Sequence, residues 1–143
     1  MKITQISVFL ENRQGRLYEV AKKLGDASIN IRALNIAETD DFGVLRIIVD
    51  RPADALAALK AAGFVASTTD IVAVEVPDHP GGLARVLKTV SETAMNVEYM
   101  YGFFEKKSEQ AILVFRFDDP DAALAALKGA GITIVNETDV KDL

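Results

Sequence analysis

The chain has 143 residues, 50% of them hydrophobic, no cysteine and a formal net charge of −5. This hydrophobic content suffices for the core of one domain or of two small ones, and the absence of cysteine excludes disulfides, thiolate metal sites and cysteine nucleophiles. The acidic balance argues against nucleic acid and anionic membranes as partners, because both draw most of their affinity from basic patches.

The first half of the chain alternates segments typical of strands and of helices. Alternating apolar residues predict a central strand over residues 2–10, and apolar residues at helical spacing from Leu17 to Leu24 predict a helix that Gly25 ends. A strand, a hairpin turn, a buried strand, an alanine-rich helix and a short strand follow, over residues 29–37, 39–43, 44–49, 52–62 and 64–68. The predicted order is therefore β-α-β-β-α-β.

The second half repeats this order. Its predicted elements are strand, helix, strand, turn, strand, helix and a final strand, over residues 71–76, 83–93, 97–104, 105–109, 111–117, 121–130 and within 132–140. The stretch from Phe64 to Val76 is almost continuously strand-like, and no linker rich in proline, glycine or serine divides it. We therefore expect two domains packed rigidly against each other, residues 1–70 and 71–143, each near the lower size limit for independent stability.

An internal duplication underlies the repeated order. Gly15 matches Gly81 at a spacing of 66 positions, and this register continues into the second strand. Beyond the hairpin the spacing grows to 68 positions, and residues 52–63 match residues 120–131. A hairpin turn can absorb such a two-residue insertion without disturbing the strands that it joins.

Right-handed crossovers turn this order into a four-stranded antiparallel sheet with both helices on one face, the ferredoxin-like fold of the α+β class. The second strand of each copy, residues 29–37 or 97–104, lies at an edge of its sheet and is long, apolar and unguarded by proline. These strands can pair with each other or with a second molecule. We expect them to join within the chain into one eight-stranded sheet, with helices left to pack against a second molecule in a homodimer.

The stretch Asp78-His79-Pro80-Gly81-Gly82-Leu83 leads from a strand through two glycines into a helix. Backbone N–H groups at a helix start have no partner within the helix, so those of Gly81, Gly82 and Leu83 can hold a carboxylate. The carboxylate of Asp78 can accept from an ammonium group of the same ligand. The stretch therefore predicts a site for a free α-amino acid. The alternative is that Asp78 only caps the helix and Pro80-Gly81 only turns the chain.

The first copy carries a counterpart of this stretch, and further candidates start the second strand of each copy. The candidate ligand-binding residues are Asn12, Gln14, Gly15, Arg16, Leu17, Asn30, Ile31, Asp78, His79, Pro80, Gly81, Gly82, Leu83, Asn96 and Val97. Pairing of the edge strands would bring each glycine loop near Asn30 or Asn96 of the other copy. A role of these asparagines only in starting their strands is equally compatible with the sequence.

Three further features admit two interpretations each. His79, the only histidine, could sense pH or touch a ligand, but no catalytic constellation accompanies it, which favours a plain exposed loop residue. The run from Tyr99 through Met100 and Tyr101 to Phe104 could line an apolar pocket or form ordinary strand core. Glu98 beside it could bias the charge of a ligand or face solvent.

We predict neither an enzyme nor a bound cofactor or metal, because no constellation of catalytic or metal-ligating residues is recognisable. The ferredoxin-like fold hosts unrelated functions. An acylphosphatase-type enzyme is one alternative, since Arg13-Gln14-Gly15-Arg16 is superficially similar to an anion loop, although the second copy lacks both arginines. A purely structural interaction module without a ligand is the other. An RNA-binding sheet would need basic surroundings that this acidic chain lacks.

The start of the chain bears on its location. Met1-Lys2-Ile3 leads directly into strand residues, without the apolar region or the cleavage site of a signal peptide. No apolar run approaches the roughly 20 residues of a membrane span. We therefore expect a cytoplasmic protein.

Through Asp78-His79-Pro80-Gly81-Gly82-Leu83 and Asn96-Val97, the sequence resembles the ACT domain family of small regulatory modules, and specifically its tandem, stand-alone members. The resemblance covers essentially the whole chain. It implies that a free amino acid binds at an interface between two such domains and allosterically controls an enzyme, a transporter or a transcription circuit, with an amino-acid metabolism enzyme or regulator as partner. The first copy departs from the family pattern, because Asn12 replaces the acid, Gln14 replaces Pro80 and Arg16 replaces the second glycine.

Overall fold

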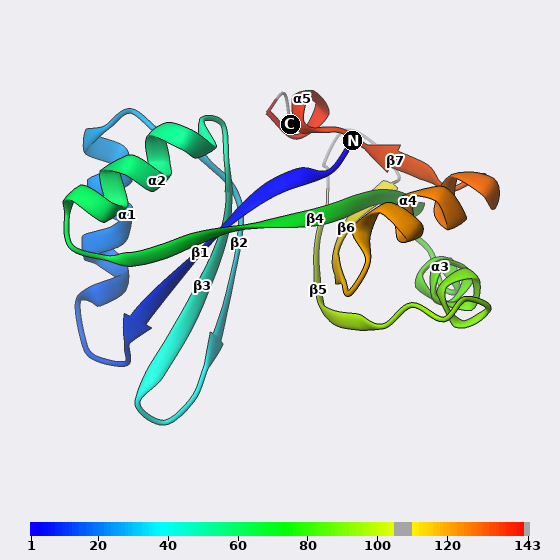
Figure 1. Cartoon of the computed structure of the whole chain (residues 1–143), viewed down its shortest axis with the longest axis horizontal. Helices are drawn as coiled ribbons and strands as arrows, with labels where there is room; N and C mark the ends of the chain where they lie inside the picture. Colours follow the sequence, from blue (N-terminus) through cyan, green and yellow to red (C-terminus); the bar gives the residue numbers. More distant parts are fainter. Residues whose placement is uncertain (105–109, 142–143) are drawn as a thin grey trace. The chain divides into compact units, whose positions relative to one another are not determined.

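The computed structural model describes residues 1–104 and 110–141, and only the backbone of Phe103, Phe104 and Lys141. The predicted turn at residues 105–109 lies outside the described residues. The chain divides into two compact units (Figure 1). The first unit is Thr4–Thr69, and the second unit is Asp70–Leu143 together with Met1–Ile3.

The first unit has the predicted order of elements. They are β1 (Ile3–Glu11), α1 (Arg16–Asp26), β2 (Ile31–Glu38), β3 (Phe42–Val49), α2 (Pro52–Ala61) and the first part of β4 (Val65–Pro77). Within this unit the strands follow the order β2-β3-β1-β4, and both β1 and β2 run antiparallel to β3. Helices α1 and α2 contact each other on one side of the sheet (Figure 1).

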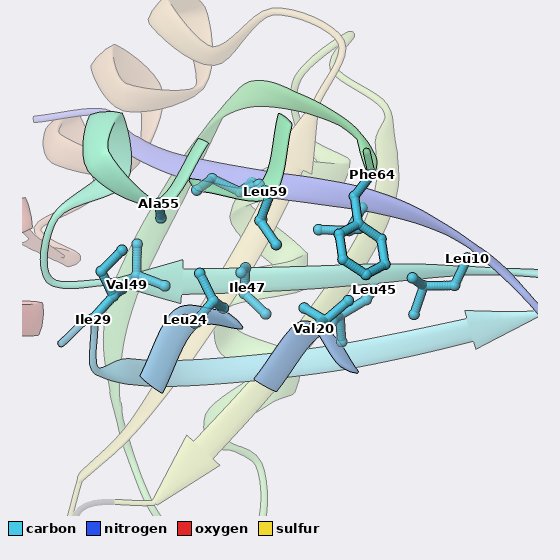
Figure 2. Close-up of a cluster of buried hydrophobic side chains, with 12 residues drawn as sticks. Leu10, Val20, Leu24, Ile29, Leu45, Ile47, Val49, Ala55, Leu59 and Phe64 are labelled. Atoms are coloured by element: carbon cyan, nitrogen blue, oxygen red, sulfur yellow. The ribbon is translucent and has the colours of Figure 1, made fainter. Parts of the chain in front are cut away.

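A single apolar core fills the space between these helices and their sheet. Val8 on β1 and Ile47 on β3 are fully buried, whereas Phe9, the neighbour of Val8, points to the other face and is half exposed. Figure 2 shows Val20 and Leu24, one helical turn apart on α1, directed toward the same strands. Burial of each such aliphatic side chain contributes about 1.5–3 kcal/mol, so the period-2 and period-3.6 patterns together define which faces meet.

The second unit repeats the order and adds a terminal helix. Its elements are the remainder of β4, then α3 (Gly82–Ser91), β5 (Val97–Phe104), β6 (Gln110–Phe117), α4 (Pro120–Gly129), β7 (Thr133–Val135) and α5 (Glu137–Lys141). The strand order is β5-β6-β4-β7, with antiparallel neighbours throughout. Its core contains the stacked rings of Phe115 and Phe117, whose centroids are 5.3 Å apart. The predicted ferredoxin-like α+β fold is thus confirmed.

The junction between the units differs from the prediction. The sequence predicts two strands, at residues 64–68 and 71–76, whereas the structure has the continuous strand β4. The intervening Ser67-Thr68-Thr69-Asp70 contains two β-branched residues and neither glycine nor proline, so it favours extended backbone and nothing in it turns the chain. β4 therefore contributes its first part to one sheet and its last part to the next.

The end of α1 also differs from the prediction, which placed it at Gly25. The helix continues to Asp26, and the chain turns at Ser28, whose φ is 59°. The N–H groups of Ser28 and Ile29 donate to the carbonyls of Gly25 and Leu24, both at 2.9 Å, in the pattern of a left-handed helix end. A serine thus occupies the position where glycine is usual.

Helix α5 is missing from the prediction. It begins with a reciprocal capping box: the N–H of Asp139 donates to the side-chain oxygen of Asn136 at 2.8 Å, and the N–H of Asn136 donates to the carboxylate of Asp139 at 3.2 Å. The sequence Asn136-Glu137-Thr138-Asp139 is the signal that could have predicted this helix.

The edge strands β2 and β5 keep the position that the sequence predicts for them. In the part of the chain that the structure describes, β2 pairs with β3 and β5 pairs with β6. The joining of β2 to β5 into one eight-stranded sheet is not among these pairings and stays a prediction.

Candidate ligand site at the strand-to-helix loops

Both strand-to-helix loops end in a glycine whose backbone is left-handed. Gly15 precedes α1 with φ 89°, and Gly81 precedes α3 with φ 92°. Side chains with a Cβ rarely adopt such angles, so both positions require glycine. Neither helix start is capped by a side chain. The duplication therefore extends to the left-handed glycine at the end of each predicted ligand loop.

In the second unit, Gly82 makes the tight turn possible. Its N–H donates to the carbonyl of His79 at 3.1 Å, and a Cβ at this position would come within 2.3 Å of the carbonyl oxygen of Pro77. An internal hydrogen bond thus occupies the Gly82 N–H, and the binding of a ligand carboxylate by this group stays a prediction. The structure gives no acceptor, within its described residues, for the N–H groups of Gly81 and Leu83.

Asp78 does not cap α3. The N-cap residue is Gly81, and no side chain accepts a hydrogen bond from the first turn. Asp78 is exposed, and among residues 1–104 and 110–141 no donor or cation is paired with its carboxylate. The structure thus rules out the capping alternative and leaves the carboxylate accessible.

His79 and Pro80 are exposed loop residues beside it. The Nδ1 atom of His79 lies 3.0 Å from the carbonyl oxygen of Pro80. Leu83 is 42% exposed on the first turn of α3. These positions agree with an accessible loop and assign no catalytic role.

A hollow of about 170 Å³ adjoins the loop of the second unit. We call it the loop hollow, and its lining includes Glu75, Pro77, Gly82, Arg85, Gln110 and Thr133, with one acidic and one basic side chain among them. Arg85 lies one turn along α3 from Gly81, and its N–H donates to the Gly81 carbonyl at 3.1 Å. The sequence analysis missed Arg85, although its spacing from Gly81 puts it on the first full turn of the helix.

In the first unit, Arg16 occupies the corresponding space. The internal register matches Arg16, Glu19 and Phe64 with Gly82, Arg85 and Ile132. The Cζ atom of Arg16 lies 4.5 Å from the centroid of the Phe64 ring, and its Nη1 donates to Glu19 Oε2 at 2.6 Å. Its buried Nε has no hydrogen-bond partner among the described residues. The Arg16 side chain is therefore held between Phe64 and Glu19, at the position where the second unit has Gly82 and no side chain.

Asn12, the counterpart of Asp78, serves the fold of the first unit. Its Nδ2 donates to the carbonyl of Asp40 at 3.2 Å, and its backbone N–H donates to the carbonyl of Asp41 at 2.9 Å. Both acceptors belong to the hairpin between β2 and β3. Gln14 and Leu17 are exposed nearby, and a second hollow of about 200 Å³ is lined by Asn12, Arg13, Arg16, Leu17 and Glu38.

Asn30 and Asn96 start their strands, as one of the two interpretations predicts. The N–H of Asn30 donates to Asp50 Oδ1 at 3.0 Å, and the N–H of Asn96 donates to Asp118 Oδ1 at 3.0 Å. Within its own unit each asparagine follows a helix of 11 or 10 residues, roughly 15 Å from the glycine loop. The structure therefore does not bring Asn30 or the adjacent Ile31 to the first loop, nor Asn96 or the adjacent Val97 to the second.

The aromatic run on β5 is only partly exposed. Tyr99, Met100 and Tyr101 are half-buried, and Met100 packs against the core of the second unit. The side chains of Phe103 and Phe104 lie outside the described residues. Glu98 Oε2 is 3.3 Å from Arg116 Nε, so an ion pair holds this carboxylate.

Two classes of site can be checked across the chain. In residues 1–104 and 110–141, no three His, Cys, Asp or Glu side chains are grouped so that they could hold a metal ion. The helices of the same residues are all too short or too polar to cross a membrane.

Two ferredoxin-like units in tandem, each with a left-handed glycine at the start of its first helix, define a class of paired small domains. The family described as "ACT domain pair" matches residues 1–143, and the chain belongs to this family.

Solved structures agree with this assignment. Protein BT0572 from Bacteroides thetaiotaomicron is 40% identical, with 100% of this chain and 98% of that chain covered and a TM-score of 0.94. The ligand-free regulatory subunit of aspartate kinase from Thermus thermophilus is 21% identical over 89% of this chain and 91% of its own, with a TM-score of 0.64. Its counterpart from Thermus flavus is 20% identical over 90% and 92%, with a TM-score of 0.59. A search of curated proteins gives no match.

Proposed function

We propose that this protein is a regulatory amino-acid sensor that binds a free α-amino acid at the Asp78–Leu83 loop of its second unit. The observation that carries the proposal is that Asp78 is exposed and unused by the fold, and that it follows Pro77, which lines a hollow together with Gly82, the counterpart of Arg16 in the first unit. A ligand site requires a polar group that the fold leaves unpaired and a hollow that can hold the ligand. The carboxylate of Asp78 and the loop hollow meet these two requirements.

The chemistry of the loop suits both ends of an α-amino acid. The carboxylate of Asp78 accepts from the ammonium group in a charge-assisted hydrogen bond. The positive end of α3, with the N–H groups of Gly81 and Leu83, attracts the carboxylate, and Arg85 adds a full positive charge one turn away. The loop hollow of about 170 Å³ then takes a small side chain.

The partners follow from the family and its fold relatives. The neighbours from two Thermus species are regulatory subunits of aspartate kinase, an enzyme of amino-acid metabolism. We propose that the present chain likewise regulates an enzyme or regulator of amino-acid metabolism allosterically, in the cytoplasm and without catalysis of its own. Exposed apolar side chains on the first unit, Phe9, Leu34, Ile36 and Phe42, support association into a homodimer.

The acylphosphatase alternative is disfavoured by the first loop. Its anion would need free guanidinium groups, but Arg16 is engaged with Glu19 and Phe64. Arg13 lies 3.2 Å from the carboxylate of Glu11. Both arginines are thus already held by groups of the fold.

Thermal unfolding in the presence of each of the twenty amino acids tests the proposal. A ligand that binds only the folded state at a hundredfold excess over its Kd adds about 2.7 kcal/mol, which is several degrees for units of this size. We expect one amino acid or a small group of them to raise Tm in this way. If no free amino acid moves Tm at millimolar concentration, the protein is the ligand-free interaction module instead.

A further inference from the structure

A row of apolar side chains crosses the sheet of the first unit on the face opposite to α1 and α2. Phe9 on β1 faces Val44 on β3, and Val44 faces Ala37 on the edge strand β2. The neighbour of Phe9, Val8, is buried in the core beneath the helices, so the row lies on the other face of the sheet. Phe42 extends the row, since the centroid of its ring lies 5.2 Å from that of Phe9.

Val65, the first residue of β4, continues this row beyond Phe9. β4 is the neighbour of β1 in the sheet. The internal registers of 66 and 68 positions match Phe9 and Val65 with Glu75 and Thr133, which face each other across β4 and β7 in the second unit. The duplication thus places Val65 opposite Phe9. We call the following residues the apolar row: Phe9, Ala37, Phe42, Val44 and Val65.

The apolar row is exposed, although the fold does not require apolar side chains there. Phe9, Phe42 and Val65 are 50%, 44% and 73% exposed. The matching positions of the second unit all carry polar side chains, namely Glu75, Gln110 and Thr133. Because both units have the same order of strands, polar side chains are compatible with the fold at these positions. Exposed apolar side chains that the fold does not need mark an interaction surface.

A hollow of about 110 Å³ lies in this surface, and its lining includes Phe9, Ala37, Phe42 and Val44. Sites for drug-sized molecules measure about 300 Å³ or more, so this hollow suits one apolar side chain rather than a whole small molecule. The insertion of one apolar side chain into a hollow is a common way in which a segment of one protein binds to another. The size of the hollow therefore favours a protein partner.

Carboxylates of the adjacent hairpin make the surroundings of the row negative. Glu38, Asp40 and Asp41 are exposed, and no ion pair involves them within residues 1–104 and 110–141. Arg13 does not neutralise them, because it is in an ion pair with a glutamate of β1 at 3.2 Å. Even with Arg46 two residues further along β3, this surface carries more negative than positive charge. Basic side chains of a partner would complement it.

The same charges argue against a second copy of the chain at this surface. In a symmetric contact both copies present the same residues, so Asp40 and Asp41 of one copy would approach those of the other. Two other exposed apolar side chains, Leu34 and Ile36, lie on the opposite face of the sheet. They stay available for contact between copies while the apolar row binds a different protein.

We propose that the apolar row docks a segment of another protein in which an apolar side chain stands between basic residues. The apolar side chain enters the hollow beside Phe9 and Phe42, and the basic residues approach Glu38, Asp40 and Asp41. This surface belongs to the first unit, so the proposal does not depend on whether an amino acid binds at the loop of the second unit.

Three peptides of equal length test the proposal on the 15N-labelled full chain. The first is acetyl-Lys-Lys-Phe-Lys-Lys-amide, the second has serine in place of phenylalanine, and the third has glutamate in place of every lysine. We expect saturable amide shifts at residues 9, 37–44 and 65 with the first peptide, and binding about fivefold or more weaker with each of the others. Equal shifts with the serine peptide would show plain charge attraction. That result, or no saturable shift with the first peptide, would overturn the proposal.

A variant that the chain itself suggests sharpens the test. Phe9→Glu, Phe42→Gln and Val65→Thr together give the row the side chains of the second unit, which folds with them, so the variant should keep a dispersed amide spectrum. Its new carboxylate attracts lysine, so weaker binding can only come from the lost apolar contact. We expect a loss of about fivefold or more for the first peptide. If the triple variant does not fold, Phe9→Glu alone is used, and unchanged or tighter binding contradicts the proposal.

Leu34→Ser is the matched control, because it removes an exposed apolar side chain from the other face of the same sheet. Binding of the first peptide should stay within about twofold of that of the unchanged chain. Sedimentation of both variants then identifies a competing occupant. If the triple variant loses a dimer that Leu34→Ser keeps, the apolar row is a contact between copies and the proposal is overturned.

Discussion

The two units share one fold and a left-handed glycine before their first helix, yet two arginines that the first unit uses to hold its own fold are absent from the second. In the first unit Arg16 lies over Phe64 and Arg51 binds the carbonyls that follow α1. In the second unit Gly82 and Asp119 take these positions, so neither guanidinium has a counterpart there. The duplicated fold thus keeps its order of elements without these two contacts.

Gly82→Ala should have the largest effect on stability. The added Cβ would meet the Pro77 carbonyl oxygen at 2.3 Å, and the backbone of the loop must shift to relieve this contact. We expect a loss of about 2–3 kcal/mol in the free energy of unfolding, measured with urea. Gly129→Ala is the control, because nothing lies within 4 Å of its Cβ and it ends a helix, so it should be neutral or stabilising by up to about 1 kcal/mol. Equal losses would contradict the close approach at Gly82.

Asp78→Asn should have the next largest effect, on ligand affinity and not on stability. The carboxylate is exposed and caps nothing, so the fold should keep its Tm, while the amino acid loses about 1.5–3 kcal/mol of binding free energy. Isothermal titration measures both the loss and the heat. Asn12→Ala should leave this affinity unchanged and instead lower stability, because Asn12 holds the hairpin of the first unit. Equal losses of affinity in the two variants would remove the distinction between the units.

Arg51→Ala should lower the free energy of unfolding by about 1 kcal/mol, because two carbonyls and one carboxylate lose their donors at a partly exposed site. Asp119→Asn keeps its cap and should change stability by less than about 0.5 kcal/mol. Urea unfolding of both variants gives the comparison. A larger loss at Asp119 than at Arg51 would contradict the greater importance of the arginine to the fold.

Ser28→Gly should have the smallest effect, and a stabilising one. Ser28 adopts φ 59°, which costs a residue with a Cβ more than it costs glycine, so we expect a gain of about 0.5–1 kcal/mol. Its counterpart Ala94 is not among the positive-φ residues that the structure describes, and Ala94→Gly should lose about 0.5–1 kcal/mol. Thermal unfolding distinguishes the two signs, and the same sign at both positions would contradict the difference in loop conformation.

Much of this architecture was predictable because local pattern and internal repetition agreed. Three signals predict the same ferredoxin-like order: the beginning of a helix after Gly15 and after Gly81, the periodicity of the strands, and the internal registers of 66 and 68 residues. Whether Asp78 caps α3 could not be predicted, because aspartate is common both at helix caps and in loops. The structure shows that Gly81 is the N-cap residue and that Asp78 does not cap the helix.

The remaining features depend on contacts that no local pattern encodes. Arg16 meets Phe64 across 48 positions, and the Gly82 N–H turns inward to His79, so neither the filled space nor the occupied donor was visible in the sequence. The shift from 66 to 68 positions hid the match between Arg51 and Asp119. β4 continues through residues 67–70, where the sequence predicts a break, because threonine favours extended backbone.

The stoichiometry of amino-acid binding tests most directly the claim that the second unit alone is the sensor. Isothermal titration of the full chain with the amino acid that raises Tm should give one bound molecule per chain, and Asp78→Asn should weaken its binding by about 1.5–3 kcal/mol while Asn12→Ala leaves it unchanged. Two equivalent molecules per chain, or one that survives Asp78→Asn unchanged, would contradict the account.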